Sequence, residues 1–129
     1  MSELNNINYA FDNAIKLLKD NNLKESIEQI EEILKIQPDH KKSLNLLADI
    51  FIKLNKPTES LKFINRVLKI DSSNKNTLEK KYKLLLYVGE ESAAFDTLLL
   101  LNTAHPSINT ARELSNYYLK HDDEEKSDE

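Results

Sequence analysis

The histidines of this sequence do not have the spacing that a metal site on a helix requires. The three histidines, His40, His105 and His121, lie far apart. None has a second histidine four residues away, the spacing that brings two ligands to one face of a helix. We expect each histidine to be an exposed or helix-capping residue, and the sequence predicts no metal site and no cofactor.

Acidic and nucleophilic side chains lead to the same expectation. The pairs Glu31–Glu32 and Glu90–Glu91 are adjacent, so on a helix their carboxylates point in different directions and do not form an acid–base dyad. There is no cysteine for thiol chemistry, and a single glycine cannot build a Gly-rich phosphate loop. We therefore expect a protein that is not an enzyme.

Composition points to one helical domain. The chain has 129 residues, of which 40% are hydrophobic and 31% charged, with one Gly and three Pro. Sandwiches and barrels need frequent tight turns, which draw heavily on glycine, so an all-β fold is unfavourable. No apolar run is long enough to span a membrane, and residues 1–6 do not resemble a signal peptide. These features predict a cytoplasmic protein without a membrane segment.

The negative charge is concentrated at the C-terminus. The formal net charge is −4, and residues 121–129 carry six acids and one lysine, a net of −5. Residues 1–120 are thus near neutral, at about +1, and offer no basic stripe for nucleic acid. Because the last nine residues have no apolar side chain to bury, we predict a disordered acidic tail over 121–129.

The strongest signal is an internal repeat with a period of about 34 residues. Shifting the chain by one period places the sequence 21–27 (NNLKESI) on 55–61 (NKPTESL), and 33–36 (ILKI) on 67–70 (VLKI). A second shift reaches Leu85, Gly89, Ala94 and Leu98. Three repeats, at about 7–40, 41–74 and 75–108, account for most of the chain.

Each repeat is predicted to contain two helices. Apolar residues recur at steps of three and four, the period of an amphipathic helix. The break between the helices falls at Asn21, Asn55 and Gly89. Asn and Gly are the residues that tolerate the left-handed conformation closing a helix, so this position has a backbone requirement. Small residues such as Ala14, Ala48 and their partners Ser26, Ser60 and Ala94 are expected where the helices approach closely.

A last amphipathic segment, at about 107–120, is predicted to cap the third repeat. Its expected buried stripe consists of Ile108, Ala111, Leu114, Ser115 and Tyr118. The residues expected on its solvent side are Glu113, Asn116 and Lys120.

A two-helix repeat of this length, with small and large residues at these positions, resembles the tetratricopeptide repeat family. The resemblance covers residues from about 7 to 118 and is best in the second repeat, with Leu44, Leu47, Ala48, Phe51 and Ser60. Tyr82 departs from the pattern, because the family has a small residue there. The resemblance implies an all-α fold, a right-handed α-solenoid, with a three-repeat domain over residues 1–120.

The resemblance also implies a concave groove lined by the first helix of each repeat. The groove residues carried over onto this sequence are Phe11, Ile15, Leu18 and Lys19 in repeat one; Asn45, Leu46, Asp49, Ile52 and Lys53 in repeat two; and Glu79, Lys80, Lys83, Leu86 and Tyr87 in repeat three. The alternative is that part of the apolar set packs into the domain itself.

One subclass of the family binds the C-terminal carboxylate of heat-shock chaperones with Lys, Asn and Arg. The corresponding positions here hold Phe11, Ile15, Leu46, Asn76 and Lys80, of which only Lys80 has suitable chemistry. The predicted groove has an apolar N-terminal half and a basic-leaning C-terminal half. It therefore predicts a ligand with an apolar stretch that is acidic at one end.

The leading functional prediction is a non-catalytic interaction module, an adaptor or scaffold that binds a peptide or a partner's helix in this groove. Two alternatives stay open. One is a small secretion-type chaperone that shields an apolar segment of a client, and the other is a structural protein that self-assembles into homo-oligomers. The sequence does not identify the partner.

Overall fold

The computed structural model describes the backbone of residues 3–127 and the side chains of residues 6–122. The described backbone forms seven α-helices and no strand. The chain divides into two compact units, residues 1–70 and residues 71–129, called unit 1 and unit 2 below. The predicted all-α architecture of helix pairs is confirmed, and the right-handed sense of the superhelix stays a prediction.

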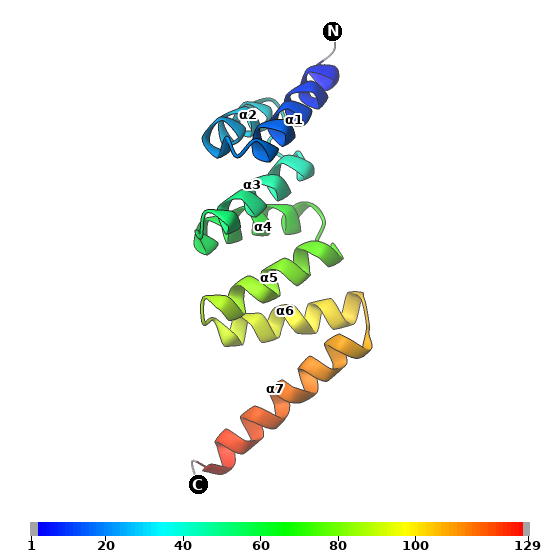
Figure 1. Cartoon of the computed structure of the whole chain (residues 1–129). Helices are drawn as coiled ribbons and strands as arrows, with labels where there is room; N and C mark the ends of the chain where they lie inside the picture. Colours follow the sequence, from blue (N-terminus) through cyan, green and yellow to red (C-terminus); the bar gives the residue numbers. More distant parts are fainter. Residues whose placement is uncertain (1–2, 128–129) are drawn as a thin grey trace. The chain divides into compact units, whose positions relative to one another are not determined.

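Unit 1 contains two helix pairs (Figure 1). The first pair is α1 (Glu3–Lys19) with α2 (Leu23–Ile36), and the second is α3 (Lys41–Lys53) with α4 (Pro57–Ile70). Within each pair the helices lie side by side, and α2 also packs against α3. Ala14, Ile30, Leu46, Leu47 and Ile50 form a buried cluster that joins α1, α2 and α3.

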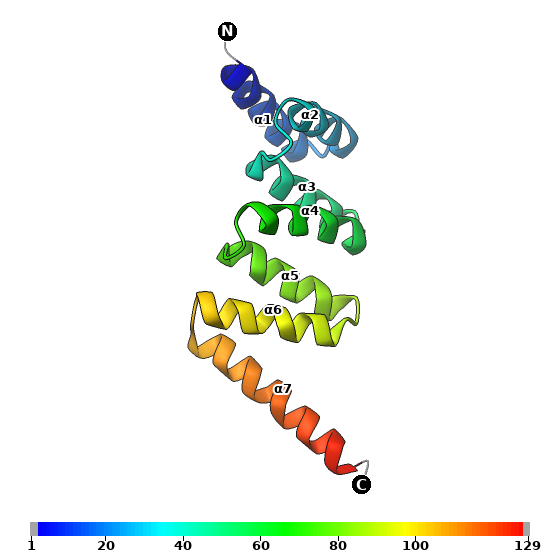
Figure 2. The same ribbon diagram turned by 180° about the vertical axis from the view of Figure 1, so that it is seen from behind.

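Unit 2 contains the third pair and one further helix (Figure 2). The pair is α5 (Lys75–Tyr87) with α6 (Glu91–Ala104), and α7 (Ile108–Ser127) packs against α6. The sequence predicted that this last helix ends near residue 120 and that a disordered tail begins at 121. In the structure the helix continues to Ser127, so the prediction is wrong for residues 121–127. The physical reason is that no Gly or Pro interrupts the segment after Pro106, and that Glu and Lys are good helix formers. Residues 128 and 129 lie outside the described part of the chain.

The turns inside the three pairs share one backbone conformation. Asn21, Asn55 and Gly89 have φ values of 64°, 58° and 85°. In each turn the next residue donates its backbone N–H to a carbonyl five residues earlier, as from Asn22 to Leu17 at 2.8 Å. This is the Schellman closure of a helix, which requires a left-handed residue. The backbone requirement inferred from the sequence is confirmed at all three positions.

Buried serines hold the first two pairs together. Ser26 Oγ donates to the carbonyl of Ala14 at 2.8 Å, and Ser60 Oγ donates to that of Ala48 at 2.8 Å. All four residues are fully buried. The predicted close approach of the helices at these small residues is therefore confirmed, and each hydroxyl is satisfied by a backbone acceptor.

Side-chain caps begin the first helix of the later pairs and also α7. The His40 ring accepts from the backbone N–H of Ser43 at the start of α3, and Asn74 Oδ1 accepts from that of Thr77 at 3.0 Å in α5. Ser107 Oγ accepts from the backbone N–H of Thr110 at 3.1 Å in α7. Each cap satisfies a backbone donor that the helix itself leaves unpaired. Among the described residues, no helix is long and apolar enough to cross a membrane.

Candidate functional site

A concave feature of unit 2 lies between α5 and α7 and is lined in part by α6. It is a pocket of about 510 Å³. Its lining residues are Lys75, Glu79, Tyr82, Lys83 and Leu86 of α5; Leu98 and Leu101 of α6; and His105, Ser107, Asn109, Thr110 and Glu113. A second pocket of about 200 Å³ shares Tyr82, Leu86, Leu98 and Glu113 with it. We call the two pockets together the α5–α7 groove.

Leucines and charged side chains have different places in this groove. Leu98 and Leu101 are buried residues of α6, whereas Leu86 is 46% exposed on α5. Lys75 and Lys83 supply positive charge from α5, and Glu79 and Glu113 of the same lining supply negative charge. The groove thus offers the exposed side chain of Leu86 for an apolar side chain of a ligand, and the ammonium groups of Lys75 and Lys83 for a carboxylate.

Tyr82 crosses the groove to α7. Its hydroxyl donates to Glu113 Oε2 at 3.2 Å. Burial of the ring, and then the charge and hydrogen bond of Glu113, raise the pKa of the Tyr82 hydroxyl above its ordinary value. Tyr82 stands at a position where the tetratricopeptide pattern has a small residue. Its large side chain has a structural role here, because it joins α5 to α7.

Three of the five groove residues predicted in repeat three lie in this groove, namely Glu79, Lys83 and Leu86. The other two do not line it: Lys80 is half-buried, and Tyr87 is 70% exposed elsewhere on α5.

The predicted apolar residues of unit 1 lie largely in its interior. Phe11, Ile15 and Leu18 are half-buried against the cluster around Ala14, and Leu46 belongs to that cluster. The physical reason is that α3 packs beside them, so their side chains stabilise the unit. The remaining predicted residues are a half-buried Asn45 and the exposed Lys19, Asp49, Ile52 and Lys53.

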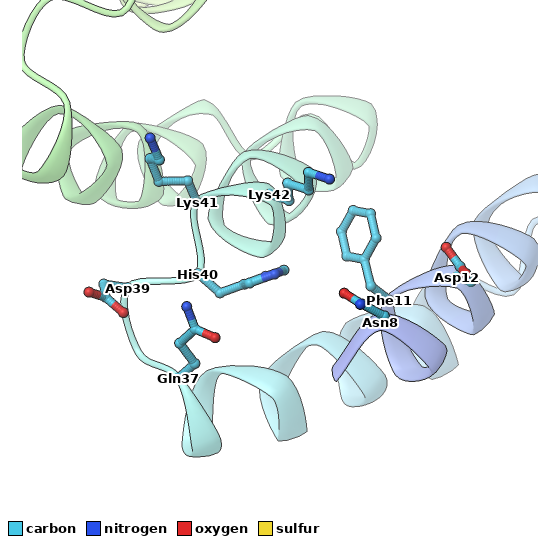
Figure 3. Close-up of a pocket in the computed structure, with 8 residues that line it drawn as sticks. All are labelled: Asn8, Phe11, Asp12, Gln37, Asp39, His40, Lys41 and Lys42. Carbon is cyan, nitrogen blue, oxygen red and sulfur yellow. The ribbon is translucent and has the colours of Figure 1, made fainter. Parts of the chain in front are cut away.

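Unit 1 has a polar pocket of about 610 Å³ near the start of α3 (Figure 3). Its lining residues are Asn8, Phe11, Asp12, Gln37, Asp39, His40, Lys41 and Lys42. Of the predicted groove residues, only Phe11 contributes to it. The Phe11 and His40 rings meet edge to face, with centroids 5.8 Å apart.

The environment of His40 favours the neutral form of its ring. Its Nδ1 accepts the backbone N–H of Ser43 at 3.3 Å and lies 2.7 Å from Ser43 Oγ. Burial, followed by the charge of Lys42, lowers the pKa of His40 below its ordinary value, against the opposite effect of Asp39. The capping role expected for this histidine is confirmed.

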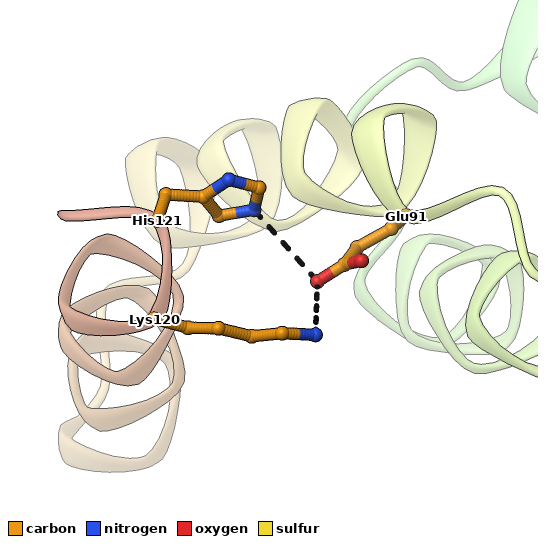
Figure 4. Close-up of polar contacts among 3 residues, drawn as sticks. All are labelled: Glu91, Lys120 and His121. Carbon is orange, nitrogen blue, oxygen red and sulfur yellow. Dashed lines mark hydrogen bonds and ion pairs between the residues drawn. The ribbon is translucent and has the colours of Figure 1, made fainter. Parts of the chain in front are cut away.

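Polar contacts fasten α7 to the first residue of α6 (Figure 4). Lys120 Nζ lies 3.0 Å from Glu91 Oε1, and His121 Nε2 lies 3.8 Å from the same oxygen. The hydrogen bond from Lys120 is the main cause that lowers the pKa of Glu91. Phe95 stacks on Tyr117 beside this contact, with ring centroids 4.0 Å apart.

The predicted buried stripe of the last helix is wrong. Ile108 is 76% exposed and Tyr118 53% exposed, and Ala111 and Ser115 are exposed as well. Only Leu114 of the predicted stripe is buried. Glu113, Asn116 and Lys120 are exposed, as expected, and they also line the smaller pocket of the groove. Contacts to Tyr82, Glu91 and Phe95 fix this rotation, and no apolar period reveals them.

Several groove residues escaped the sequence reasoning. Lys75, Tyr82 and the α6 leucines lie outside the carried-over positions, and Glu113 was expected on the solvent side. Tyr82 alone carried a signal, its departure from the small residue of the family pattern. In the described part of the chain, no group of three or more His, Cys, Asp and Glu residues could hold a metal ion.

Comparison with known proteins gives a family for one segment. The family model described as tetratricopeptide repeat matches residues 42–74. This segment covers α3 and α4 and coincides with the second predicted repeat. A search of curated proteins finds no match.

Solved structures extend the likeness to most of the chain. A crystal structure of MamA is 15% identical over 89% of this chain and 63% of its own, with a TM-score of 0.76. The first such repeat domain of Spaghetti (RPAP3), bound to an HSP90 peptide, is 12% identical over 88% and 91%, with a TM-score of 0.71. The TPR2B domain of yeast Sti1, in complex with Hsp70, is 19% identical over 92% and 97%, with a TM-score of 0.68.

At these identities the likeness concerns the fold. The chain spans less than two thirds of the length of that MamA structure. Residues 42–74 match the tetratricopeptide repeat, and the chain has the all-α helix-pair fold of tetratricopeptide-repeat proteins.

Proposed function

We propose that this protein is a non-catalytic interaction module, an adaptor that binds a peptide or a partner's helix. The observation that carries the proposal is the α5–α7 groove, in which Leu86, Leu98 and Leu101 lie close to Lys75 and Lys83. Domains of the same fold from Spaghetti and yeast Sti1 have been solved with chaperone peptides or complexes. A cytoplasmic location is part of the proposal.

The chemistry of the groove supports a ligand with an apolar side chain next to an acidic one. The apolar side chain packs on the exposed Leu86, and the acidic group lies near Lys75 and Lys83. A ligand that depends on a clamped C-terminal carboxylate is not supported. Three of the five positions that would form such a clamp hold Phe11, Ile15 and Leu46, which are half-buried or buried and have no donor.

Selection from a displayed random-peptide library tests the proposal. We expect enriched peptides to carry an apolar residue followed by acids. Leu86→Glu should weaken their binding by roughly tenfold or more, because it puts a like charge on the apolar surface of the groove. Leu100→Glu is the matched control: Leu100 is 59% exposed on α6 and does not line the groove. Equal losses in both variants, or enriched peptides without acids, would contradict the proposal.

A further inference from the structure

The outer face of α7 carries a continuous row of exposed residues. Ile108, Arg112, Ser115, Leu119 and Asp122 follow one another at alternating steps of four and three. That spacing keeps a row on one side of a helix. Ile108 is 76% exposed and Leu119 63% exposed, and the other three side chains are exposed too.

This face points away from the rest of unit 2. The opposite side of the helix makes the contacts to α5 and α6, through Leu114, Tyr117 and Glu113. In Figures 1 and 2, α6 lies along one side of α7, and within the described residues no other helix of unit 2 lies beyond it. Ile108 and Leu119 thus expose large apolar side chains on this face, and burying them against another surface would be favourable.

We propose that the outer face of α7 pairs with the same face of a second copy of this chain, in antiparallel orientation. The distribution of charge favours this occupant. Arg112 lies toward the N-terminal end of the row and Asp122 toward the C-terminal end. A twofold axis near Ser115 brings Arg112 of one copy to the same end as Asp122 of the other. A parallel pair would instead bring like charges together.

The sizes of the side chains agree with this arrangement. Ser115 is small and lies at the centre of the face, Ala111 and Leu119 lie four residues from it on opposite sides, and Ile108 lies seven residues from it. Small residues at the crossing allow two helix backbones to approach closely, and the larger residues then pack against the neighbouring helix on either side. The surface is therefore complementary to itself under a twofold rotation.

The expected dimer is weak. The face is one side of one helix, which falls short of the roughly 800 Å² per partner of a stable complex. We expect a dissociation constant in the micromolar range or weaker. This inference is independent of peptide binding, because the groove lies on the other side of α7.

Sedimentation equilibrium on the full chain, from about 10 µM to about 1 mM, tests the association. The apparent mass should rise from 14.9 kDa toward twice that value. Leu119→Glu should weaken dimerisation by roughly tenfold or more, because it places a charge in the apolar contact. Leu100→Glu, on the exposed face of α6, should leave dimerisation unchanged, and circular dichroism checks that both variants are folded.

Single cysteines test the orientation, because the natural chain has none. Under mild oxidation Ser115→Cys should form a disulfide-linked dimer, whereas Ile108→Cys should not, since an antiparallel pair separates the two copies of residue 108. Cross-linking at both positions would indicate a parallel pair and overturn the proposed geometry. A monomeric mass at all concentrations would overturn the proposal altogether and leave this face to a different protein.

Discussion

At the scale of single residues, three left-handed positions determine where each helix pair turns. Asn21, Asn55 and Gly89 occupy the same place in successive repeats and have positive φ. No atom lies within 4 Å of a Cβ built on Gly89, so its requirement is one of backbone conformation rather than of space. Asparagine meets the same requirement in the other two turns because its short polar side chain tolerates this conformation.

Asn55→Ala should therefore lower the free energy of unfolding by about 1–2 kcal/mol, the cost of the left-handed conformation for an ordinary residue. Asn55→Gly should stay within about 1 kcal/mol of the natural protein, since glycine adopts this conformation freely. Urea unfolding followed by circular dichroism measures both. If the alanine and glycine variants were equally stable, the backbone argument would be wrong.

His40 should make the stability depend on pH. Only a neutral ring accepts the N–H of Ser43, and the pKa of His40 is lowered in the folded state. The unfolded chain therefore binds a proton at higher pH than the folded one. The stabilisation is present above the ordinary histidine pKa of about 6.5 and is lost as the pH falls through the lower folded pKa.

The comparison of the natural protein with His40→Asn isolates this effect, because asparagine caps a helix without titrating near neutral pH. Between about pH 7.5 and pH 5 the natural protein should lose more stability than the variant. Unfolding midpoints in urea across this range provide the measurement. Curves that run parallel would show that protonation of His40 does not affect the fold.

At the scale of helices, the buried serine hydroxyls fasten the pairs of unit 1. Ser60→Ala removes the hydrogen bond to Ala48 and should cost about 0.5–1.5 kcal/mol. Thr58→Ala removes a hydroxyl from an exposed position of the same helix and should cost less than about 0.5 kcal/mol. Chemical denaturation of the two variants gives the comparison, and equal losses would mean that the buried bond contributes nothing specific.

Aromatic contacts of Phe95 contribute to the attachment of α7. Tyr117 lies nearly parallel to Phe95, at a ring-centroid distance of 4.0 Å, whereas Tyr118 is 53% exposed and meets the same ring edge to face at 5.3 Å. Tyr117→Ala should cost about 2 kcal/mol, from lost apolar burial and stacking, and Tyr118→Ala clearly less. Thermal unfolding monitored by circular dichroism compares the two. A larger loss at Tyr118 would mean that α7 is rotated as the sequence predicted.

The predictable part of this structure is the part that repeats. The period of the repeat gives the helix pairs, their turns and the small residues between them, because each depends on contacts within one repeat. The rotation of α7 does not follow from any period. It depends on single long-range contacts, such as those of Tyr82 with Glu113 and of Phe95 with Tyr117, which outweigh the apolar stripe.

The candidate groove shows the same division. Glu79, Lys83 and Leu86 were predicted from their position in the repeat and line the α5–α7 groove. The same positions in repeat one hold Phe11, Ile15 and Leu18, whose large apolar side chains pack against the core of unit 1. Position in the repeat thus determines the direction of a side chain, and the neighbouring helix determines whether it is left accessible.

At the scale of the whole molecule, the two units differ in how well their interiors are fastened. Most of the buried apolar side chains among the described residues belong to unit 1, as do both buried Ser–Ala hydrogen bonds. In unit 2, Tyr82 of α5 and Ala94 of α6 take the places of Ala48 and Ser60, so α6 has no serine hydroxyl at this position. Repeat proteins distribute stability among neighbouring units, so these differences should be measurable separately.

Amide hydrogen exchange should therefore be slower in α3 and α4 than in α5 and α6. Exchange followed by mass spectrometry on peptides from both units measures this directly, because opening of a unit exposes its own amides. Ser60→Ala should speed exchange in α3 and α4 by roughly fivefold, the equivalent of about 1 kcal/mol, and leave α6 unchanged. Uniform protection across both units, with an equal response of all helices to Ser60→Ala, would mean that the chain opens as one cooperative body.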